Sequence, residues 1–101
     1  MTRLVATPRF RFDTNEILKY LETVAGRAVA EKYGSRIDQT IVRLAAFPES
    51  GAPRPALGAD ARVALVPPYL LIYDYTPPDE VLILLRLLHG RRNITAALLR
   101  P

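Results

Sequence analysis

Residues 81–92 read VLILLRLLHGRR, and this stretch decides how the chain folds. Residues 81–88 are all apolar except Arg86. A run this apolar and this short is typical of a strand buried on both faces, so we expect it to be the central strand of a small sheet. Its far end carries the only histidine, His89, followed by Arg91 and Arg92. The stretch therefore predicts a buried spine with a charged end at one edge of the domain.

Further strands are predicted on either side of this stretch in the chain. Residues 62–66 and 69–76 are extended runs joined by Pro67-Pro68, and residues 77–80 separate the second run from Val81. Short proline-rich turns between extended runs indicate an antiparallel meander. Residues 3–7 (RLVAT) predict one more short strand, because the proline that follows disfavours a helical conformation at Thr7.

Two amphipathic helices fill the region between the first strand and the meander. Asp13 or Thr14 is expected to cap the first helix, which ends at Gly26. The second helix is expected to start near Arg27 and to end at Phe47-Pro48, with Gly34 marking a close contact between helices. The predicted apolar faces follow helical spacing: Ile17, Leu21 and Val24 in the first helix, and Ala30, Tyr33, Ile37, Ile41 and Leu44 in the second.

The element order β-α-α-β-β-β predicts an α+β fold, with a helix hairpin packed on one side of a small, mainly antiparallel sheet. With 101 residues, there is room for one domain, residues 1–101. Residues 48–60 are rich in proline and glycine and form a connector. Residues 93–99 are expected to add a last helical turn capped by Asn93.

Composition excludes several classes of protein. There is no cysteine and only one histidine, so we expect no disulfide, metal site or cofactor. No stretch has transmembrane length and the start of the chain lacks a signal-peptide pattern, so we expect a cytoplasmic protein. The net charge is +4, and arginine supplies twelve of the fourteen basic residues. This balance indicates an anionic partner, either nucleic acid or an acidic protein surface.

The turn lengths predict a register for the meander. A two-residue turn at Pro67-Pro68 places Arg62 opposite Tyr73, and a four-residue turn at 77–80 places Leu71 opposite Arg86. On this register Arg62, Tyr69, Tyr73 and Arg86 share one face, although a slip of one residue would move Arg86 to the other. The opposite face would then receive the helix hairpin, through Leu70, Ile72, Ile83, Leu85 and Leu87.

Each singled-out residue also has a structural interpretation. Arg86 either contacts a partner or pairs with a carboxylate such as Asp74. His89 either contacts a partner or makes a structural hydrogen bond at the strand end. Arg91 and Arg92 are either a contact surface or a solvated terminus. The tyrosines either fill the core or form a stacking platform.

The element order, the helix end LAAFP at 44–48 and the strand end LRLLHGRRN at 85–93 resemble the ParE-type toxins of the RelE/ParE superfamily. The resemblance spans nearly the whole chain, and 85–93 is its most specific part. It implies the toxin of a type II toxin–antitoxin pair, neutralised by a ParD-type antitoxin that alone contacts DNA. Free ParE-type toxins are associated with inhibition of DNA gyrase, whereas the RelE-like branch cuts mRNA in the ribosomal A site.

The residues bear on the choice between these branches. Metal-free RNA cleavage needs cations at the phosphate and groups that move protons, roles that Arg62, Arg86 and His89 could fill. Both lysines, however, fall in the helix hairpin and no tyrosine follows Tyr75, while the His-Gly-Arg ending has the ParE-like form. We therefore expect a non-enzymatic gyrase inhibitor. A RelE-like endonuclease remains one alternative, and a basic nucleic-acid-binding module is another.

Two sets of candidate contacts follow. A groove between the helix hairpin and the sheet edge would accept an amphipathic helix of the antitoxin, through the exposed flanks of apolar residues and through basic residues facing its acidic groups. The antitoxin-binding candidates are Arg9, Arg11, Ile17, Leu18, Leu21, Tyr33 and Ile37. The target-binding candidates are His89, Arg91 and Arg92, with Arg62 and Arg86 second.

Overall fold

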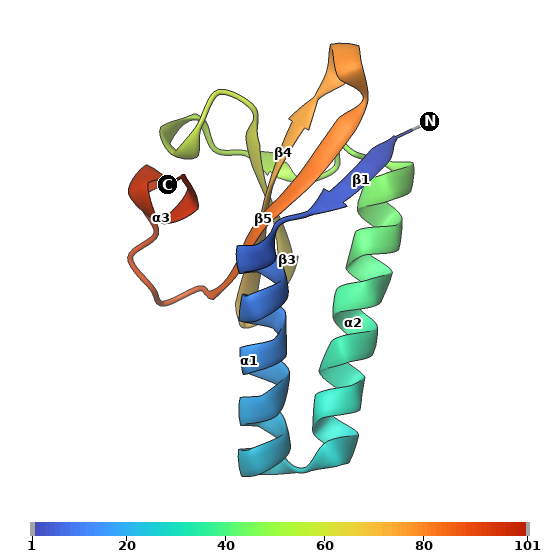
Figure 1. Ribbon diagram of the computed structural model, residues 1–101, viewed down its shortest axis with the longest axis vertical. Coiled ribbons are helices and arrows are strands. Elements are labelled where there is room, and N and C mark those ends of the chain that lie inside the picture. The colour runs from blue at the N-terminus through green and yellow to red at the C-terminus, as the bar shows by residue number, and fades with distance from the viewer. Residues whose placement is uncertain (1, 101) are drawn as a thin grey trace.

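The computed structural model describes residues 2–100, in which two long helices pack against one face of a five-stranded sheet (Figure 1). The predicted α+β class and helix hairpin are confirmed. The helices are α1 (Pro8–Ala25), α2 (Arg27–Ala46) and the short α3 (Ala96–Leu99), with 3₁₀ turns at Pro55–Leu57 and Pro77–Asp79. The strands are β1 (Arg3–Ala6), β2 (Ala52–Pro53), β3 (Ala61–Val66), β4 (Tyr69–Thr76) and β5 (Val81–His89).

The sheet has the order β1-β5-β4-β3-β2. The antiparallel meander β3-β4-β5 is as expected, but β4 rather than β5 takes the middle position. Strand β1 runs parallel to β5 and forms one edge of the sheet, and the two-residue β2 forms the other. Strand β5 therefore lies between β1 and β4, so both of its edges are paired although it is not the middle strand.

Helix α1 begins earlier than the sequence predicts. Thr7, not Asp13 or Thr14, is the cap: its Oγ1 accepts a hydrogen bond from the Phe10 N–H at 3.1 Å. Pro8 occupies the first turn, where its missing N–H costs nothing. The helix therefore gains a full turn, and Asp13 becomes an interior residue available for a tertiary contact.

The hairpin itself forms as expected, with α1 and α2 antiparallel and side by side beyond the lower end of the sheet (Figure 1). Gly26, with a φ of 94°, makes the break between them. Close contact at Gly34 is confirmed, because a Cβ there would lie 3.8 Å from a methyl group of Leu18.

The face of the sheet that the helices cover is the opposite of the predicted one, except at Leu87, which lies under the helices as expected. Side chains of β4 and β5 pack with Phe10 of α1 and with Ile37 and Leu44 of α2. The sequence could not choose between the faces because both are apolar. The strand residues under the helices are Ala64, Val66, Tyr69, Leu71, Tyr73, Tyr75, Leu82, Leu84 and Leu87.

The other face of the sheet is covered by the C-terminal tail. Leu99 of α3 is buried there, and the expected last helical turn forms, with Thr95 rather than Asn93 at its cap position. Arg100 donates to both carboxylate oxygens of Asp74, at 2.9 and 3.0 Å, and to the carbonyl of Leu57. The tail packs against Val63, Ile72, Leu85 and Leu88.

The predicted register holds from both turns until a β-bulge interrupts it. Arg62 lies opposite Tyr73 and Thr76 lies opposite Val81, as expected. A shift between Ile72 and Tyr73 then places Arg86 opposite Ile72 instead of Leu71. One extra residue in β5 reverses the face of everything beyond it. The predicted placement of Arg86 beside Tyr69 and Tyr73 is therefore wrong.

Candidate functional site

Arg86 is a buried structural cation. Its Nε donates to Asp13 Oδ2 at 2.7 Å and its Nη2 to Oδ1 at 3.0 Å, while its Nη1 donates to the Leu98 carbonyl at 2.9 Å. The Leu87 N–H also donates to Asp13 Oδ2. The hydrogen bond with Asp13 raises the pKa of Arg86 above its ordinary value. The pair joins α1, β5 and the tail, and the partner carboxylate is Asp13 rather than Asp74.

Arg62 also serves the fold, at least in part. Its Nη1 donates to the carbonyls of Glu49 and Gly51, both at 2.8 Å. The neighbouring Tyr73 hydroxyl donates to the Pro48 carbonyl and accepts from the Gly51 N–H. Together, Arg62 and Tyr73 hold the segment that follows α2 against the sheet. No room remains for a side chain at Gly51, whose Cβ would overlap the Tyr73 ring.

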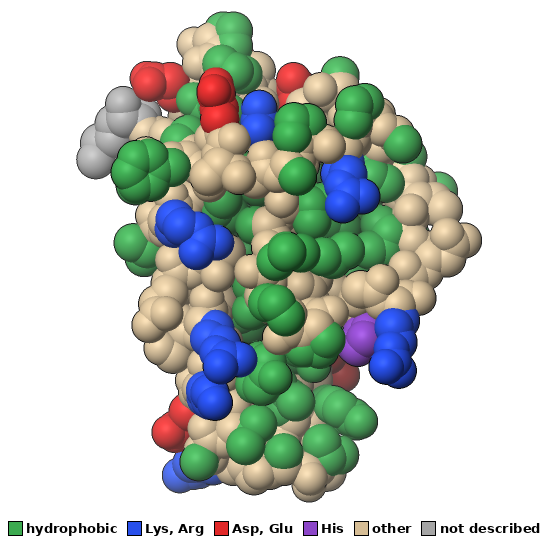
Figure 2. Space-filling model, turned by 180° about the vertical axis from the view of Figure 1, so that it is seen from behind, with side chains coloured by type: hydrophobic (Ala, Val, Ile, Leu, Met, Phe, Trp, Pro, Cys, Tyr) green, Lys and Arg blue, Asp and Glu red, His purple; other side chains and the backbone are tan. Residues whose placement is uncertain are grey.

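His89, Arg91 and Arg92 lie exposed where β5 ends. His89 Nδ1 accepts a hydrogen bond from the Arg91 N–H at 3.0 Å, so a neutral ring carries its proton on Nε2. The ring meets Tyr69 edge to face, with centroids 5.7 Å apart. In Figure 2 the histidine lies against a basic side chain at the margin of the molecule. Three of the five target-binding candidates are thus brought together, while Arg62 and Arg86 are engaged elsewhere.

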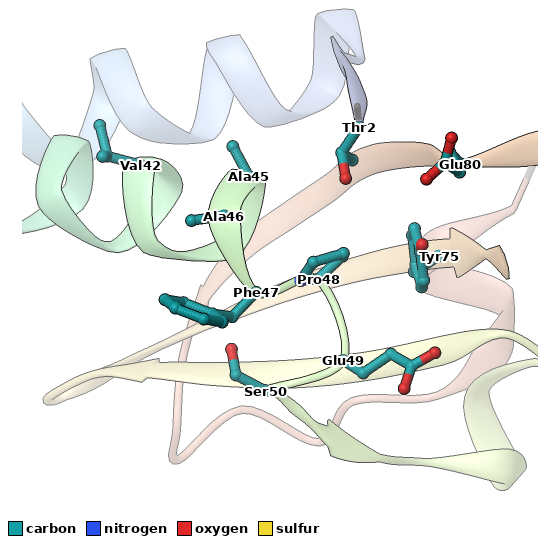
Figure 3. Close-up of a pocket in the computed structure, with 10 residues that line it drawn as sticks. All are labelled: Thr2, Val42, Ala45, Ala46, Phe47, Pro48, Glu49, Ser50, Tyr75 and Glu80. Carbon is teal, nitrogen blue, oxygen red and sulfur yellow. The ribbon is translucent and has the colours of Figure 1, made fainter.

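A hollow of about 1000 Å³ lies at the C-terminal end of α2. Val42 and Phe47 are 69% and 66% exposed at its wall, although both are apolar. Figure 3 shows the last turns of α2 on one side, Thr2, Tyr75 and Glu80 on the other, and Pro48 between them. A hollow with exposed apolar walls is suited to a partner's apolar side chains rather than to catalysis.

A second hollow of about 370 Å³ lies nearer the middle of α2. It lies between α2, the first turns of α1 and the edge strand β1, and its lining includes Ile41, Leu4 and Arg11. We call the two hollows together the α2–β1 groove. The groove exists because α1 turns away from β1 at Thr7 and leaves that end of the sheet without a second helix (Figure 1).

The antitoxin-binding candidates are dispersed relative to this groove. Arg11 and Ile37 line it. The expectation that Ile37 offers an exposed flank is wrong, because its side chain packs in the core and is only 2% exposed. Ile17 and Leu18 are half-buried against the core, Leu21 is half-buried elsewhere on α1, Tyr33 faces the end of the sheet, and Arg9 is exposed on α1.

Sequence reasoning missed the groove residues Leu4, Val42 and Phe47. Val42 lies off the apolar spacing of α2, and such an apolar surplus on a helix was the available signal. Leu4 could not be assigned to a wall, because the parallel pairing of β1 with β5 is a tertiary feature.

Metal and membrane chemistry receive no support from residues 2–100. No group of three or more His, Cys, Asp or Glu side chains gathers there as metal ligands would. Neither long helix in this part of the chain carries an apolar stretch sufficient to span a bilayer.

Comparisons with known proteins agree with this architecture. Residues 4–94 match the family described as "ParE toxin of type II toxin-antitoxin system, parDE". A solved structure titled "Chromosomal ParDE TA system from P. aeruginosa" superposes with a TM-score of 0.73 at 21% identity, covering 88% of this chain and 96% of that one. A search of curated proteins found no match. Since the family match spans most of the sequence, the chain belongs to the ParE toxin family of ParDE type II toxin–antitoxin systems.

Proposed function

We propose that this toxin is neutralised by a ParD-type antitoxin whose amphipathic helix lies in the α2–β1 groove. The observation that carries this proposal is the exposure of Val42 and Phe47 in the larger of two hollows that α2 helps to line. A partner helix places apolar residues at i, i+3, i+4 and i+7 into such a groove. Arg11 at the rim, with Arg9 on the same helix, is positioned to meet acidic antitoxin residues.

Matched double variants test the groove. Val42→Ala/Phe47→Ala removes two groove side chains, whereas Phe12→Ala/Val24→Ala removes the same residue types outside it, where they are 64% and 58% exposed. We expect the groove variant to weaken binding of the adjacent-gene antitoxin by tenfold or more, about 1.4 kcal/mol, in titration calorimetry. The control should change affinity less than twofold. Equal effects of the two variants would show that the groove is misplaced.

We further propose that the free toxin inhibits DNA gyrase through contact rather than catalysis, with His89, Arg91 and Arg92 meeting the target. The three residues are exposed together at the end of β5, outside the α2–β1 groove. Exposed arginines beside an aromatic anchor are typical of protein interfaces.

The alternative of mRNA cleavage has less support. Arg86 is held by Asp13 and Arg62 by two carbonyls, so neither guanidinium is arranged around an open phosphate site. The His89 ring is engaged with the Arg91 N–H and with the edge of Tyr69, apart from both of these arginines. Metal-free cleavage needs both kinds of group at the phosphate.

Induced expression of the toxin alone tests the target. We expect growth arrest, inhibition of gyrase supercoiling in vitro and intact mRNA ends. Arg91→Ala/Arg92→Ala should relieve the arrest without loss of antitoxin binding. Cuts mapped to the ribosomal A site would replace the gyrase proposal with the nuclease, and full toxicity of the double variant would move the contact elsewhere.

A further inference from the structure

An aromatic row joins α2 to the end of β5. The Tyr33 and Tyr69 rings meet edge to face with centroids 6.1 Å apart, and Tyr69 meets His89 in the same way at 5.7 Å. Arg36 lies over the Tyr33 ring, with its Cζ 5.3 Å from the centroid. Three contacts therefore connect a cation of α2 to the strand end. We call Tyr33, Arg36, Tyr69, His89 and Arg91 the strand-end surface.

The row fixes its polar members in position. Tyr69 is only 7% exposed and packs in the core beneath Tyr33. The hydrogen bond from the Arg91 N–H holds the His89 ring from its other side. Stacking on Tyr33 restrains the Arg36 guanidinium, which is otherwise costly to immobilise. The surface thus presents restrained donors, and less side-chain freedom is lost when a partner binds.

The charges of this surface have one sign. Arg36 and Arg91 are its charged members, and both are exposed. Lys32 and Arg43, four residues before and seven after Arg36, extend the basic flank of α2. In Figure 2 basic side chains lie at both margins of the molecule, with hydrophobic side chains between them. A partner that fits must be acidic around an apolar centre.

The ring geometry favours a protein over a nucleic acid. Bases stack on free aromatic faces. Here the interplanar angles are 86° and 81°, so neighbouring rings meet edge to face, and Arg36 covers a face of Tyr33. Tyr33 is half-buried, and an accessible tyrosine with a flanking arginine is instead typical of a protein contact.

We propose that the target contact extends from the strand end to Tyr33 and Arg36 on α2, with the buried Tyr69 supporting it from beneath, and that it receives an acidic protein surface. The inference rests on the proposed function, since it enlarges the target contact of the free toxin. It places target and antitoxin on opposite flanks of α2.

Charge reversal at Arg36 tests the inference. Arg36→Glu should raise the concentration needed to inhibit gyrase at least tenfold and relieve growth arrest, with unchanged thermal unfolding and antitoxin affinity. Arg54→Glu is the matched control, because Arg54 is also exposed but lies away from the strand-end surface. Its backbone N–H donates to the carbonyl of Ala61, at the end of β3 farther from Tyr69. Arg36→Gln removes the charge with a residue that also favours a helix. It should weaken inhibition at least threefold, and it replaces Arg36→Glu as the test if the charge reversal unfolds the chain.

The outcomes separate the inference from the proposed function. If the wild type inhibits gyrase and Arg36→Glu is as potent, the inference falls and the function stands. If the wild type arrests growth without inhibiting gyrase, the gyrase target falls, and relief of arrest by Arg36→Glu alone still supports the surface. A wild type without toxicity overturns both. Binding of a single-stranded oligonucleotide that Arg36→Glu abolishes would overturn the protein partner.

Discussion

The arginines inside the sheet and those at its lower end differ in what meets their guanidinium groups. Arg86 is 8% exposed and donates its hydrogen bonds to Asp13 and to a backbone carbonyl. Arg91 and Arg36 are exposed, one beyond β5 and the other stacked on a tyrosine. The difference teaches that a basic chain contains two populations of cation, and that only the second is available to a partner. Substitutions at the buried arginine should change stability, whereas substitutions at the exposed arginines should change function.

Removing the carboxylate under Arg86 should have the largest effect. Asp13→Ala leaves a buried guanidinium without its counter-charge, which typically costs about 3–5 kcal/mol of folding free energy. Urea denaturation followed by circular dichroism measures the loss. The double variant Asp13→Ala/Arg86→Met should recover most of it, since the uncompensated charge is gone. A loss under about 1 kcal/mol would show that the pair is not desolvated.

Tyr73→Phe should come next. The change orphans the Gly51 N–H and the Pro48 carbonyl, so we expect a loss of about 1–3 kcal/mol in the same denaturation experiment. Tyr75→Phe is the control, because Tyr75 is comparably buried and its hydroxyl makes no hydrogen bond within residues 2–100. Similar losses in both variants would show that the hydrogen bonds of the Tyr73 hydroxyl to Pro48 and Gly51 do not cause the effect.

The buried tyrosines Tyr69 and Tyr73 should make the stability of the fold depend on pH. Burial raises the pKa of Tyr69 and Tyr73 above the ordinary 10.0. The folded state then holds these protons more tightly than the unfolded state, so their contribution is fully present below pH 10 and is lost as the pH rises through the folded pKa. We expect the urea midpoint to fall above pH 10, and to fall less steeply in Tyr73→Phe.

Arg100→Ala should cost less. The guanidinium grips both oxygens of Asp74, yet its side chain is 42% exposed, so solvent screens the pair and the expected loss is at most about 1 kcal/mol. Raising the salt concentration should shrink the difference from wild type. A salt-independent loss would assign the effect to packing of the tail instead.

Arg91→Ala/Arg92→Ala should change stability least, by less than about 0.5 kcal/mol, because neither side chain is buried or ion-paired within residues 2–100. Thermal unfolding of this variant beside Asp13→Ala tests the comparison directly. A large destabilisation would move these arginines into the structural population.

The sequence predicted the features that neighbouring residues set more reliably than those that depend on contacts between distant residues. Local signals placed α2, the Gly26 break, the Pro67-Pro68 turn and the pairing of Arg62 with Tyr73, because neighbouring residues set them. The cap at Thr7 was also local, but Asp13 and Thr14 competed with it as capping residues. Of the candidate sites, the exposed strand end was predicted and the α2–β1 groove was located only in outline.

The sequence by itself determined the α+β class, the helix hairpin, the meander and the family signature at 85–93, since these follow from periodicity, turn residues and local motifs. Only the tertiary structure decided which face of the sheet the helices cover, that β1 pairs in parallel with β5, and that Arg86 reaches Asp13. The first two depend on contacts between segments distant in the chain, and both faces of the sheet are apolar. The third follows from the β-bulge in β5 opposite Ile72 and Tyr73. With no polar face to fix the register, one inserted residue reverses the side-chain pattern without any mark in the sequence.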